Sequence, residues 1–254
     1  MRVNCAVSWK INFVGPHTIE GLLCNKGKTM LIAVEGADKA GKHTQVVNMV
    51  DYLNVAHSIP TETLDFPQYK SYWGMFIQDY LTGKFGDNTR TLPAEYTMLP
   101  YALDRAAHMP QIKKWVQANK WVVFDRYTYS NAYSIAKLPR EQWNDKINHL
   151  EEMEFNQMGI IRPDYNIYLY LPAEISYKMR HEGLKAYQNG KPDIHENDFK
   201  LLEDVADVYK TLAARDPKHW TVVNEMKPDG TRMNPNEVFA QIRLILDGMI
   251  SRTK

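Results

Sequence analysis

Two glycines and a lysine in VEGADKAGKHTQ, residues 34–45, have the spacing of a loop that binds phosphate groups. Gly36, four further residues, Gly41 and Lys42 satisfy the pattern G-x-x-x-x-G-K. The glycines let backbone N–H groups turn toward a phosphate, and the N-terminus of the following helix adds partial positive charge. An apolar strand pattern precedes the loop and a helical pattern follows it. We therefore expect a phosphate site with Lys42 at the terminal phosphates, rather than a glycine turn that binds nothing.

The residue after the lysine departs from the usual pattern, in which a serine or threonine hydroxyl binds Mg²⁺. His43 stands there, and neutral imidazole is a poor ligand for a hard cation that prefers oxygen. Thr44 is no substitute, since a shift of one residue turns a helical side chain by about 100°. We expect water, the nucleotide's own oxygens and Asp38 to hold the metal instead, with phosphate binding retained.

Short apolar runs without alternation predict strands that are covered on both faces, and stretches with helical spacing separate them. The predicted strands occupy residues 30–35, 61–65, 121–125, 165–171 and 220–224. The predicted helices occupy residues 42–55, 72–81, 95–118, 140–157, 199–214 and 235–250. Strands that alternate with helices imply right-handed crossovers. The sequence therefore predicts an α/β fold in which helices cover both faces of a five-stranded parallel sheet.

The composition narrows the class of protein. The 254 residues include 31 basic and 30 acidic side chains, and a net charge of +1 argues against binding to a nucleic acid polymer. Small anionic ligands remain compatible, because a local basic patch fits within a neutral total. No apolar run reaches the ~18 residues that a membrane-spanning helix needs. The two cysteines, Cys5 and Cys24, exclude a disulfide scaffold and a cysteine-based zinc site, and we expect a cytoplasmic location.

Residues 1–29 differ from the rest of the chain. The stretch CAVSWKINFVG is too short and too interrupted for the apolar region of a secretory signal. An additional strand, a loose tail and an upstream start all remain open. We expect a peripheral N-terminal extension followed by one domain over residues 30–254.

Aromatic and polar residues follow the second predicted strand, at the carboxyl end where α/β sheets bind ligands. In FPQYK, residues 66–70, Phe66 and Pro67 are placed to wall a pocket. Tyr69 and Lys70 are placed to reach an anion. A plain strand-to-loop turn plugged by an aromatic side chain fits the same residues.

Tyr101 and Arg105 are four residues apart in a predicted helix, so they lie on one face. A ring beside a guanidinium suits a planar heterocycle, which the ring would stack on and the guanidinium would hydrogen-bond. A cation–π contact at the surface is the alternative.

Asp125 and Arg126 end the third predicted strand, near the phosphate loop. A carboxylate at this place resembles the metal-binding or base residue of phosphoryl-transfer enzymes. The guanidinium of Arg126 offers two parallel hydrogen bonds to a phosphate. A surface ion pair of little energetic value is the alternative.

Residues 180–198 are polar and contain glycine, between two predicted helices. Long ordered loops in compact domains are often lids over active sites. A mobile surface loop has the same composition, so both interpretations stay open.

With these motifs in order, residues 30–254 resemble the thymidylate kinases, which are P-loop nucleoside monophosphate kinases. The matching stretches are EGADKAGKHTQ, FPQY, LPYALDR, DRYTYSNAY and RPDYNIYLYLPAE, followed by a basic lid. The resemblance implies the three-layer P-loop kinase fold with a lid, and transfer of the γ-phosphoryl group of ATP to dTMP in the presence of Mg²⁺. It also implies a homodimer formed through helices. A kinase for another deoxynucleoside monophosphate and a nucleotide-binding paralogue with little catalysis remain alternatives.

The same resemblance assigns roles to individual residues. The implied ATP-binding residues are Gly36, Ala37, Asp38, Lys39, Ala40, Gly41, Lys42, His43, Thr44 and Arg180. The implied dTMP-binding residues are Phe66, Tyr69, Tyr101, Arg105, Arg126, Asn131 and Tyr133, with Tyr101 stacked on thymine and Arg105 and Asn131 at the base edge. The implied catalytic residues are Lys42, Lys39, Asp38 and Arg126, the lid residues Lys185, Asp193 and Glu196, and the Mg²⁺ residues Asp38 and Asp125.

The chain also departs from the family pattern. Lys39 supplies a point charge where one branch of the family has an arginine in the phosphate loop, and Gln68 replaces the arginine of FPxR. The spacing after SNA is altered, so Tyr133 is only a candidate for the tyrosine that rejects a ribose 2′-hydroxyl.

Overall fold

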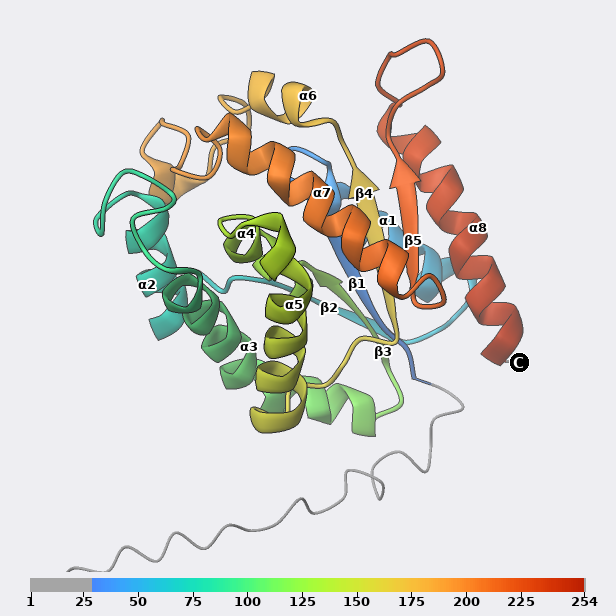
Figure 1. The fold of residues 1–254 in the computed structure, drawn as a ribbon. Helices are drawn as coiled ribbons and strands as arrows, with labels where there is room; N and C mark the ends of the chain where they lie inside the picture. Colours follow the sequence, from blue (N-terminus) through green and yellow to red (C-terminus); the bar gives the residue numbers. More distant parts are fainter. Residues whose placement is uncertain (1–28, 254) are drawn as a thin grey trace, which may run out of the picture.

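The computed structural model describes residues 29–253, whose five strands form one parallel sheet (Figure 1). The strands are β1 (Leu31–Gly36), β2 (Thr61–Asp65), β3 (Trp121–Asp125), β4 (Tyr165–Tyr170) and β5 (Trp220–Asn224). Their order in the sheet is β2-β3-β1-β4-β5, and all four neighbouring pairs are parallel. The predicted five-stranded parallel sheet is confirmed. Residues 1–28 of the predicted N-terminal extension lie outside the described residues.

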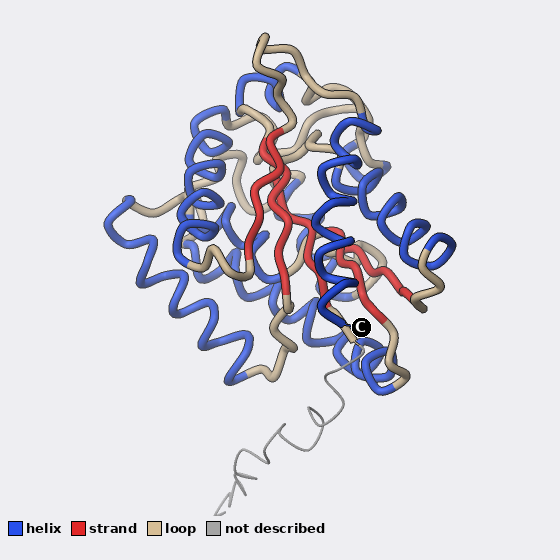
Figure 2. The backbone as a smooth tube through the Cα atoms, turned by 90° about the vertical axis from the view of Figure 1, so that its right-hand side faces the viewer, coloured by secondary structure: helices blue, strands red, loops and turns tan. Residues whose placement is uncertain are grey.

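Helices cover both faces of this sheet (Figure 2). They are α1 (Lys42–Asp51), α2 (Tyr72–Leu81), α3 (Ala94–Gln117), α4 (Ala132–Ile135), α5 (Trp143–Glu151), α6 (Ala173–Lys178), α7 (Phe199–Arg215) and α8 (Pro235–Thr253). The predicted helices 42–55 and 140–157 include π-helical ends, Tyr52–Ala56 and Glu152–Gln157. The short helices α4 and α6 were not predicted.

Two apolar cores lie on opposite faces of the sheet and explain the apolar runs in the strands. In β1, Ile32 and Val34 pack against α1 and α8, whereas Leu31 and Ala33 pack against α3, α4, α5 and α7. All four side chains are at most 3% exposed, so both faces of this strand are covered. The predicted three-layer α/β architecture is therefore confirmed.

The carboxyl ends of three adjacent strands gather the candidate site segments. The phosphate loop follows β1, the segment FPQYK follows β2, and Arg126 follows β3. The backbone N–H of Arg126 donates to the Val34 carbonyl of β1 at 3.0 Å. Residues 180–198, called the lid segment below, connect α6 to α7 at the same edge, and their backbone reaches α2 through the Ile194 N–H and the Leu81 carbonyl. Within residues 29–253, no helix has the length and apolar character needed to cross a membrane.

Candidate active site

A cavity of about 560 Å³ opens where the loops after β1, β2 and β3 meet the lid segment. Most of the predicted site residues line it: Asp38, Lys39, Gly41, Lys42, His43, Phe66, Tyr69, Tyr101, Arg105, Asp125, Arg126, Tyr133, Lys185, Asp193 and Glu196. Six others do not: Gly36, Ala37, Ala40, Thr44, Asn131 and Arg180. The fold thus brings chemistry-bearing residues from several distant stretches of the chain to one place.

Two glycines shape the turns of the phosphate loop. Gly41 precedes α1 with a φ of 65°, in the left-handed region. Gly36 lies so close to β4 that a Cβ atom there would come within 2.7 Å of the Leu169 carbonyl oxygen. These two constraints account for the glycine spacing, and they bring Lys42, the first residue of α1, to the cavity.

Lys42 is nearly buried and reaches back across the loop. Its Nζ donates to the Ala37 carbonyl at 2.7 Å. Burial, with the nearby charge of Arg126, lowers the pKa of the Lys42 ammonium to about 8. A phosphate bound beside this ammonium would raise the pKa again, because an opposite charge favours the protonated form. The electrostatics therefore favour an anion at this position.

Asp38 is held between two other predicted site residues. Nη2 of Arg126 donates to Oδ1 of Asp38 at 2.5 Å, and the Tyr133 hydroxyl donates to Oδ2 at 2.9 Å. Burial opposes ionisation of Asp38, but the charges of Arg126 and Lys42 lower the pKa of its carboxyl well below the ordinary value. Arg126 itself has a φ of 68°, a conformation that residues other than glycine rarely adopt. This conformation directs its guanidinium over the phosphate loop, where Nη1 also donates to the Gly36 carbonyl at 3.1 Å.

The carboxylates that could hold Mg²⁺ are few. No group of three or more His, Cys, Asp or Glu suited to a metal ion occurs within residues 29–253. Asp38 and Asp125 both line the cavity, and their oxygens are the donors that Mg²⁺ prefers. His43 Nδ1 lies 3.7 Å from Asp125 Oδ2, and the His43 side chain is 83% exposed. Asp125 and Asp38 are the carboxylates of the cavity nearest in type to Mg²⁺ ligands, and both oxygens of Asp38 already accept from Arg126 and Tyr133.

Arg105 forms a buried ion pair rather than the surface contact with Tyr101 that the spacing also allowed. Arg105 is 1% exposed. Its Nε donates to Glu154 Oε2 at 2.8 Å and its Nη2 to Oε1 at 2.5 Å, while Nη1 donates to the Tyr127 carbonyl at 3.2 Å. Although burial opposes the charge, Glu154 raises the pKa of the Arg105 guanidinium. Arg105 thus contributes to the cavity wall with all three nitrogens already bonded to the protein.

Among the six predicted residues that do not line the cavity, Asn131 and Arg180 are held elsewhere by local partners. Asn131 is 2% exposed, and its Nδ2 donates to Glu154 at 3.1 Å, so it lies behind the wall beside Arg105. Arg180 packs its guanidinium over the Tyr177 ring at 3.9 Å and donates to the Tyr177 carbonyl. Local partners hold both side chains away from the cavity in this structure.

Aromatic side chains form part of the cavity wall. Tyr101 is half-buried there, and Phe66 packs against the Tyr127 ring with centroids 5.9 Å apart. Tyr69 contacts Tyr187 of the lid segment at a centroid distance of 4.7 Å. The side chain of Gln68, which replaces a family arginine, turns back to Asp65. These rings suit contact with a planar group.

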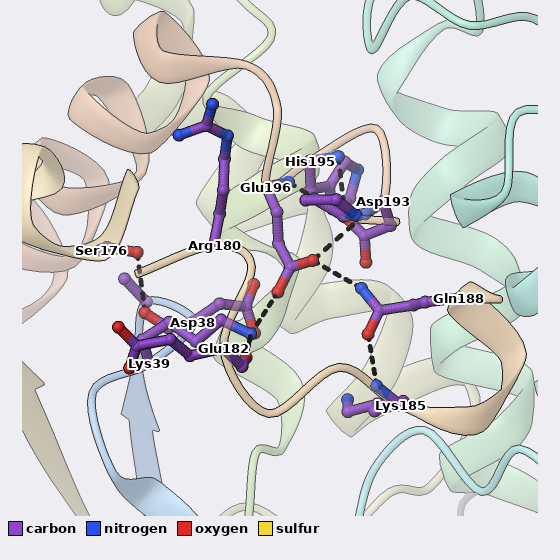
Figure 3. A network of polar contacts seen from close by, with 12 residues as sticks. Asp38, Lys39, Ser176, Arg180, Glu182, Lys185, Gln188, Asp193, His195 and Glu196 are labelled. Carbon is purple, nitrogen blue, oxygen red and sulfur yellow. Dashed lines mark hydrogen bonds and ion pairs between the residues drawn. The ribbon is translucent and has the colours of Figure 1, made fainter. Parts of the chain in front are cut away.

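The lid segment contacts the phosphate loop directly (Figure 3). Lys39 Nζ donates to the Glu182 carbonyl at 2.7 Å and forms an ion pair of 2.9 Å with Glu196. Glu196 also accepts from Gln188 and from the backbone of Asp193. Lys185 Nζ lies 3.3 Å from the Tyr69 hydroxyl. Burial, with the charge of Asp38, raises the pKa of the Asp193 carboxyl to about 7.

Sequence reasoning missed two buried carboxylates behind the cavity. Glu35 is 0% exposed and accepts from the Tyr127 backbone, the Ser130 hydroxyl and the Tyr209 hydroxyl. A lone carboxylate in the apolar stretch MLIAVEG was a readable signal for it. Glu154, the partner of Arg105, is one of several acidic residues in EEMEFNQ, and nothing in that stretch distinguishes it.

A parallel sheet with a phosphate loop after its central strand, and a lid segment over the same edge, defines a nucleoside monophosphate kinase of the P-loop class. The family model for thymidylate kinase matches residues 34–232. Since that match spans more than half of the sequence, the chain belongs to the thymidylate kinase family.

Similar proteins support this assignment. The thymidylate kinase of Mycobacterium tuberculosis is 33% identical over 217 residues, 84% of this chain and 97% of the relative. That of Plasmodium falciparum is 29% identical over 188 residues, 74% of this chain and 77% of the relative. The solved thymidylate kinase of Candida albicans has a TM-score of 0.66 and 21% identity over 89% of this chain and 94% of its own. The solved thymidylate kinase of Ehrlichia chaffeensis has a TM-score of 0.61 and 18% identity, and the match covers 86% of this chain and 98% of its own. The two structures support the fold, and the sequence matches support the family.

Proposed function

We propose that this chain transfers the γ-phosphoryl group of ATP to dTMP, giving dTDP and ADP. The observation that carries the proposal is the continuity of one cavity. The cations Lys42 and Arg126 and the aromatic side chains of Tyr69 and Tyr101 line this one cavity. A nucleotide with its phosphate beside the cations and its base against the rings fits this lining.

The chemistry needs alignment and charge neutralisation more than a general base, because the acceptor phosphate is already an anion. Lys42 and Arg126 stabilise negative charge on the transferring group. Asp38, ionised and held by Arg126 and Tyr133, orients the acceptor. When bound, Mg²⁺ would neutralise charge on the phosphate oxygens, and Asp38 and Asp125 are the residues that would hold it.

The acceptor side follows from the aromatic wall. Tyr101 stacks on thymine, and the edge of Arg105 closes the pocket beside it. Tyr133, fixed by its hydrogen bond to Asp38, is placed to exclude a ribose 2′-hydroxyl. The lid segment excludes water during transfer, which limits the loss of ATP to hydrolysis.

A second copy of the chain is proposed to cover an apolar face on α2 and α3. Tyr72 is 73% exposed, Met75 52%, Tyr96 69% and Leu99 42%. The two helices lie side by side (Figure 1), and exposed apolar side chains concentrated on one face are typical of interfaces. Sedimentation should give twice the chain mass, and Tyr96→Glu should halve it. A monomeric wild type would contradict the homodimer.

The proposed location of the protein is the cytoplasm.

The test of the activity is ADP formation from ATP and Mg²⁺ across dTMP, dUMP, dCMP, dGMP and AMP. We expect turnover with dTMP and weaker turnover with dUMP. Preference for another deoxynucleoside monophosphate would contradict the acceptor assignment. ATP binding without turnover on any acceptor would indicate a nucleotide-binding protein without kinase activity.

A further inference from the structure

A chain of hydrogen-bonded side chains joins the lid segment to two helices beside the cavity, and the proposed transfer chemistry uses none of them. His195 of the lid segment is 5% exposed and lines the cavity (Figure 3). Its Nε2 lies 2.9 Å from the hydroxyl of Tyr80 on α2. The Tyr80 oxygen accepts a hydrogen bond of 2.5 Å from Nζ of Lys137, which follows α4.

Lys137 sets the direction of the hydrogen bonds in this chain. A protonated lysine only donates, and Lys137 donates to two hydroxyl groups, those of Tyr80 and Thr97. The Tyr80 oxygen therefore accepts from Lys137 and gives its own proton to His195 Nε2. With Nε2 as an acceptor, the neutral imidazole carries its proton on Nδ1.

The environment of His195 keeps its ring neutral and fixed. Burial, with the charge of Lys137, lowers the pKa of the His195 imidazole to about 3. The ring lies flat against the Tyr133 ring, with centroids 5.0 Å apart and 11° between the planes. Among residues 29–253, the bond to Tyr80 is the one hydrogen bond of the ring. The Nδ1–H donor is therefore available to a ligand.

His195 contacts two parts of the cavity wall. On one side it stacks on Tyr133, whose hydroxyl donates a hydrogen bond to Asp38 of the phosphate loop. On the other side it contacts Tyr80, which forms a buried cluster with Ile77 and Leu81 against which Tyr101 packs. In a bound nucleotide, the sugar is the part between the phosphate and the base.

We propose that Lys137 is a positioning residue that holds His195, through Tyr80, as the Nδ1–H tautomer, so that the lid segment presents a hydrogen-bond donor to the 3′-hydroxyl oxygen of the acceptor nucleotide. The inference rests on the proposed function and adds a lid-borne contact to the acceptor sugar. It makes lid closure sensitive to the acceptor rather than to ATP alone.

The chain of hydrogen bonds reverses when Lys137 loses its proton. Burial, with the charge of Arg90, lowers the pKa of Lys137 to about 7. A neutral Lys137 can accept from Tyr80, which then accepts from His195 and moves the imidazole proton to Nε2. The KM for dTMP should therefore rise as the pH passes above about 7. Other charged groups also surround this chain of hydrogen bonds. Asp193 and Asp198 lie near Tyr80, and Asp38 and Arg126 lie near His195.

Histidine ¹⁵N spectra of the full chain test the tautomer without using activity. His195→Gln assigns the signal among the eight histidines. At about pH 6, where most of Lys137 is protonated, we expect the Nδ1–H form in the wild type and in Lys137→Arg, and a shift toward Nε2–H in Lys137→Met. The same tautomer in the wild type and Lys137→Met would overturn the proposal, whichever acceptor the enzyme phosphorylates.

Kinetics with two acceptors then test the contact to the sugar. Lys137→Met should raise the KM for dTMP roughly three- to tenfold and leave the KM for ATP unchanged, as expected for one lost hydrogen bond. With 3′-deoxythymidine monophosphate as the acceptor, this difference should disappear. A rise in both KM values, or a difference that persists with the 3′-deoxy acceptor, would overturn the proposal.

Lys137→Arg provides the matched control, because arginine stays charged over the whole pH range. Between pH 6 and pH 9 (about the range in which lysine at this site titrates), the KM for dTMP should rise more in the wild type than in Lys137→Arg. Asp193 has a pKa in the same range but is present in both proteins, so it cannot produce the difference. Identical pH profiles would contradict the role of Lys137.

Discussion

The phosphate loop and the lid segment meet in one cavity, yet different interactions build them. Backbone geometry shapes the loop, through the left-handed Gly41 and the close approach of Gly36 to β4. The lid segment contains one short 3₁₀ turn, Ala186–Gln188, and side-chain contacts hold it, such as the ion pair between Lys39 and Glu196. The loop should therefore keep its shape without a ligand, whereas the position of the lid should depend on charges that a nucleotide supplies or screens.

The largest expected effect concerns the loop. Lys42→Ala should lower kcat/KM at least about 100-fold, because one charged donor to the transferring group is lost in a desolvated site. Steady-state ADP formation measures the loss. Lys113→Ala, which removes an exposed lysine on α3, is the matched control and should stay near the wild-type rate. Activity equal to the wild type in Lys42→Ala would refute the loop mechanism.

A smaller effect is expected for the lid. Glu196→Gln removes the ion pair with Lys39 and should raise the KM for dTMP roughly tenfold, in keeping with the loss of a charge-assisted hydrogen bond. It should also raise the rate of ATP hydrolysis without an acceptor. Glu174→Gln makes the same charge change at an exposed position on α6 and should leave both unchanged. If the two variants behave alike, the ion pair does not hold the lid.

The pH dependence of ATP use separates the loop from the lid. Below a pKa of about 8, Lys42 is charged in the free enzyme, and it loses this charge as the pH rises through that value. Since kcat/KM reports the free enzyme, kcat/KM for ATP should fall above about pH 8. The fall in kcat should occur at a higher pH than the fall in kcat/KM, because bound phosphate raises the pKa of Lys42. Profiles for ATP that stay flat from pH 6.5 to pH 9.5 (about 1.5 units either side of the Lys42 midpoint) would contradict this assignment.

The smallest effect is expected at His43, whose side chain is 83% exposed. His43→Thr restores the usual hydroxyl and should keep or raise kcat within a fewfold range, while lowering the Mg²⁺ concentration for half-maximal activity. Titration of Mg²⁺ at saturating ATP and dTMP measures the change. A large loss of activity would show that the imidazole has a function of its own.

The fold could be predicted from the sequence because its signals are local. Strands β1 and β3 are apolar on both faces, so they read as continuous apolar runs, and the glycine spacing of the phosphate loop follows from its backbone. Residues at strand ends converge because parallel strands share one carboxyl edge. This rule alone predicted that Asp38, Arg126 and Tyr69 would lie in the same region.

The partners of the buried polar groups could not be predicted in this way. Arg105 pairs with Glu154, 49 residues away, and no local pattern distinguishes this carboxylate from its acidic neighbours. The same carboxylate holds Asn131 away from the cavity. In the lid segment, His195 and Glu196 find partners on α2 and in the phosphate loop, and these contacts exist only once the chain has folded.

Hydrogen–deuterium exchange of the full chain tests the difference between loop and lid most directly. It compares the free protein, the protein with Mg²⁺ and a non-hydrolysable ATP analogue, and the protein with both the analogue and dTMP. Residues 36–45 should be protected by the analogue alone, and residues 180–198 should gain most of their protection only when dTMP is added. Full protection of residues 180–198 by the analogue alone, or none with both ligands, would contradict the account.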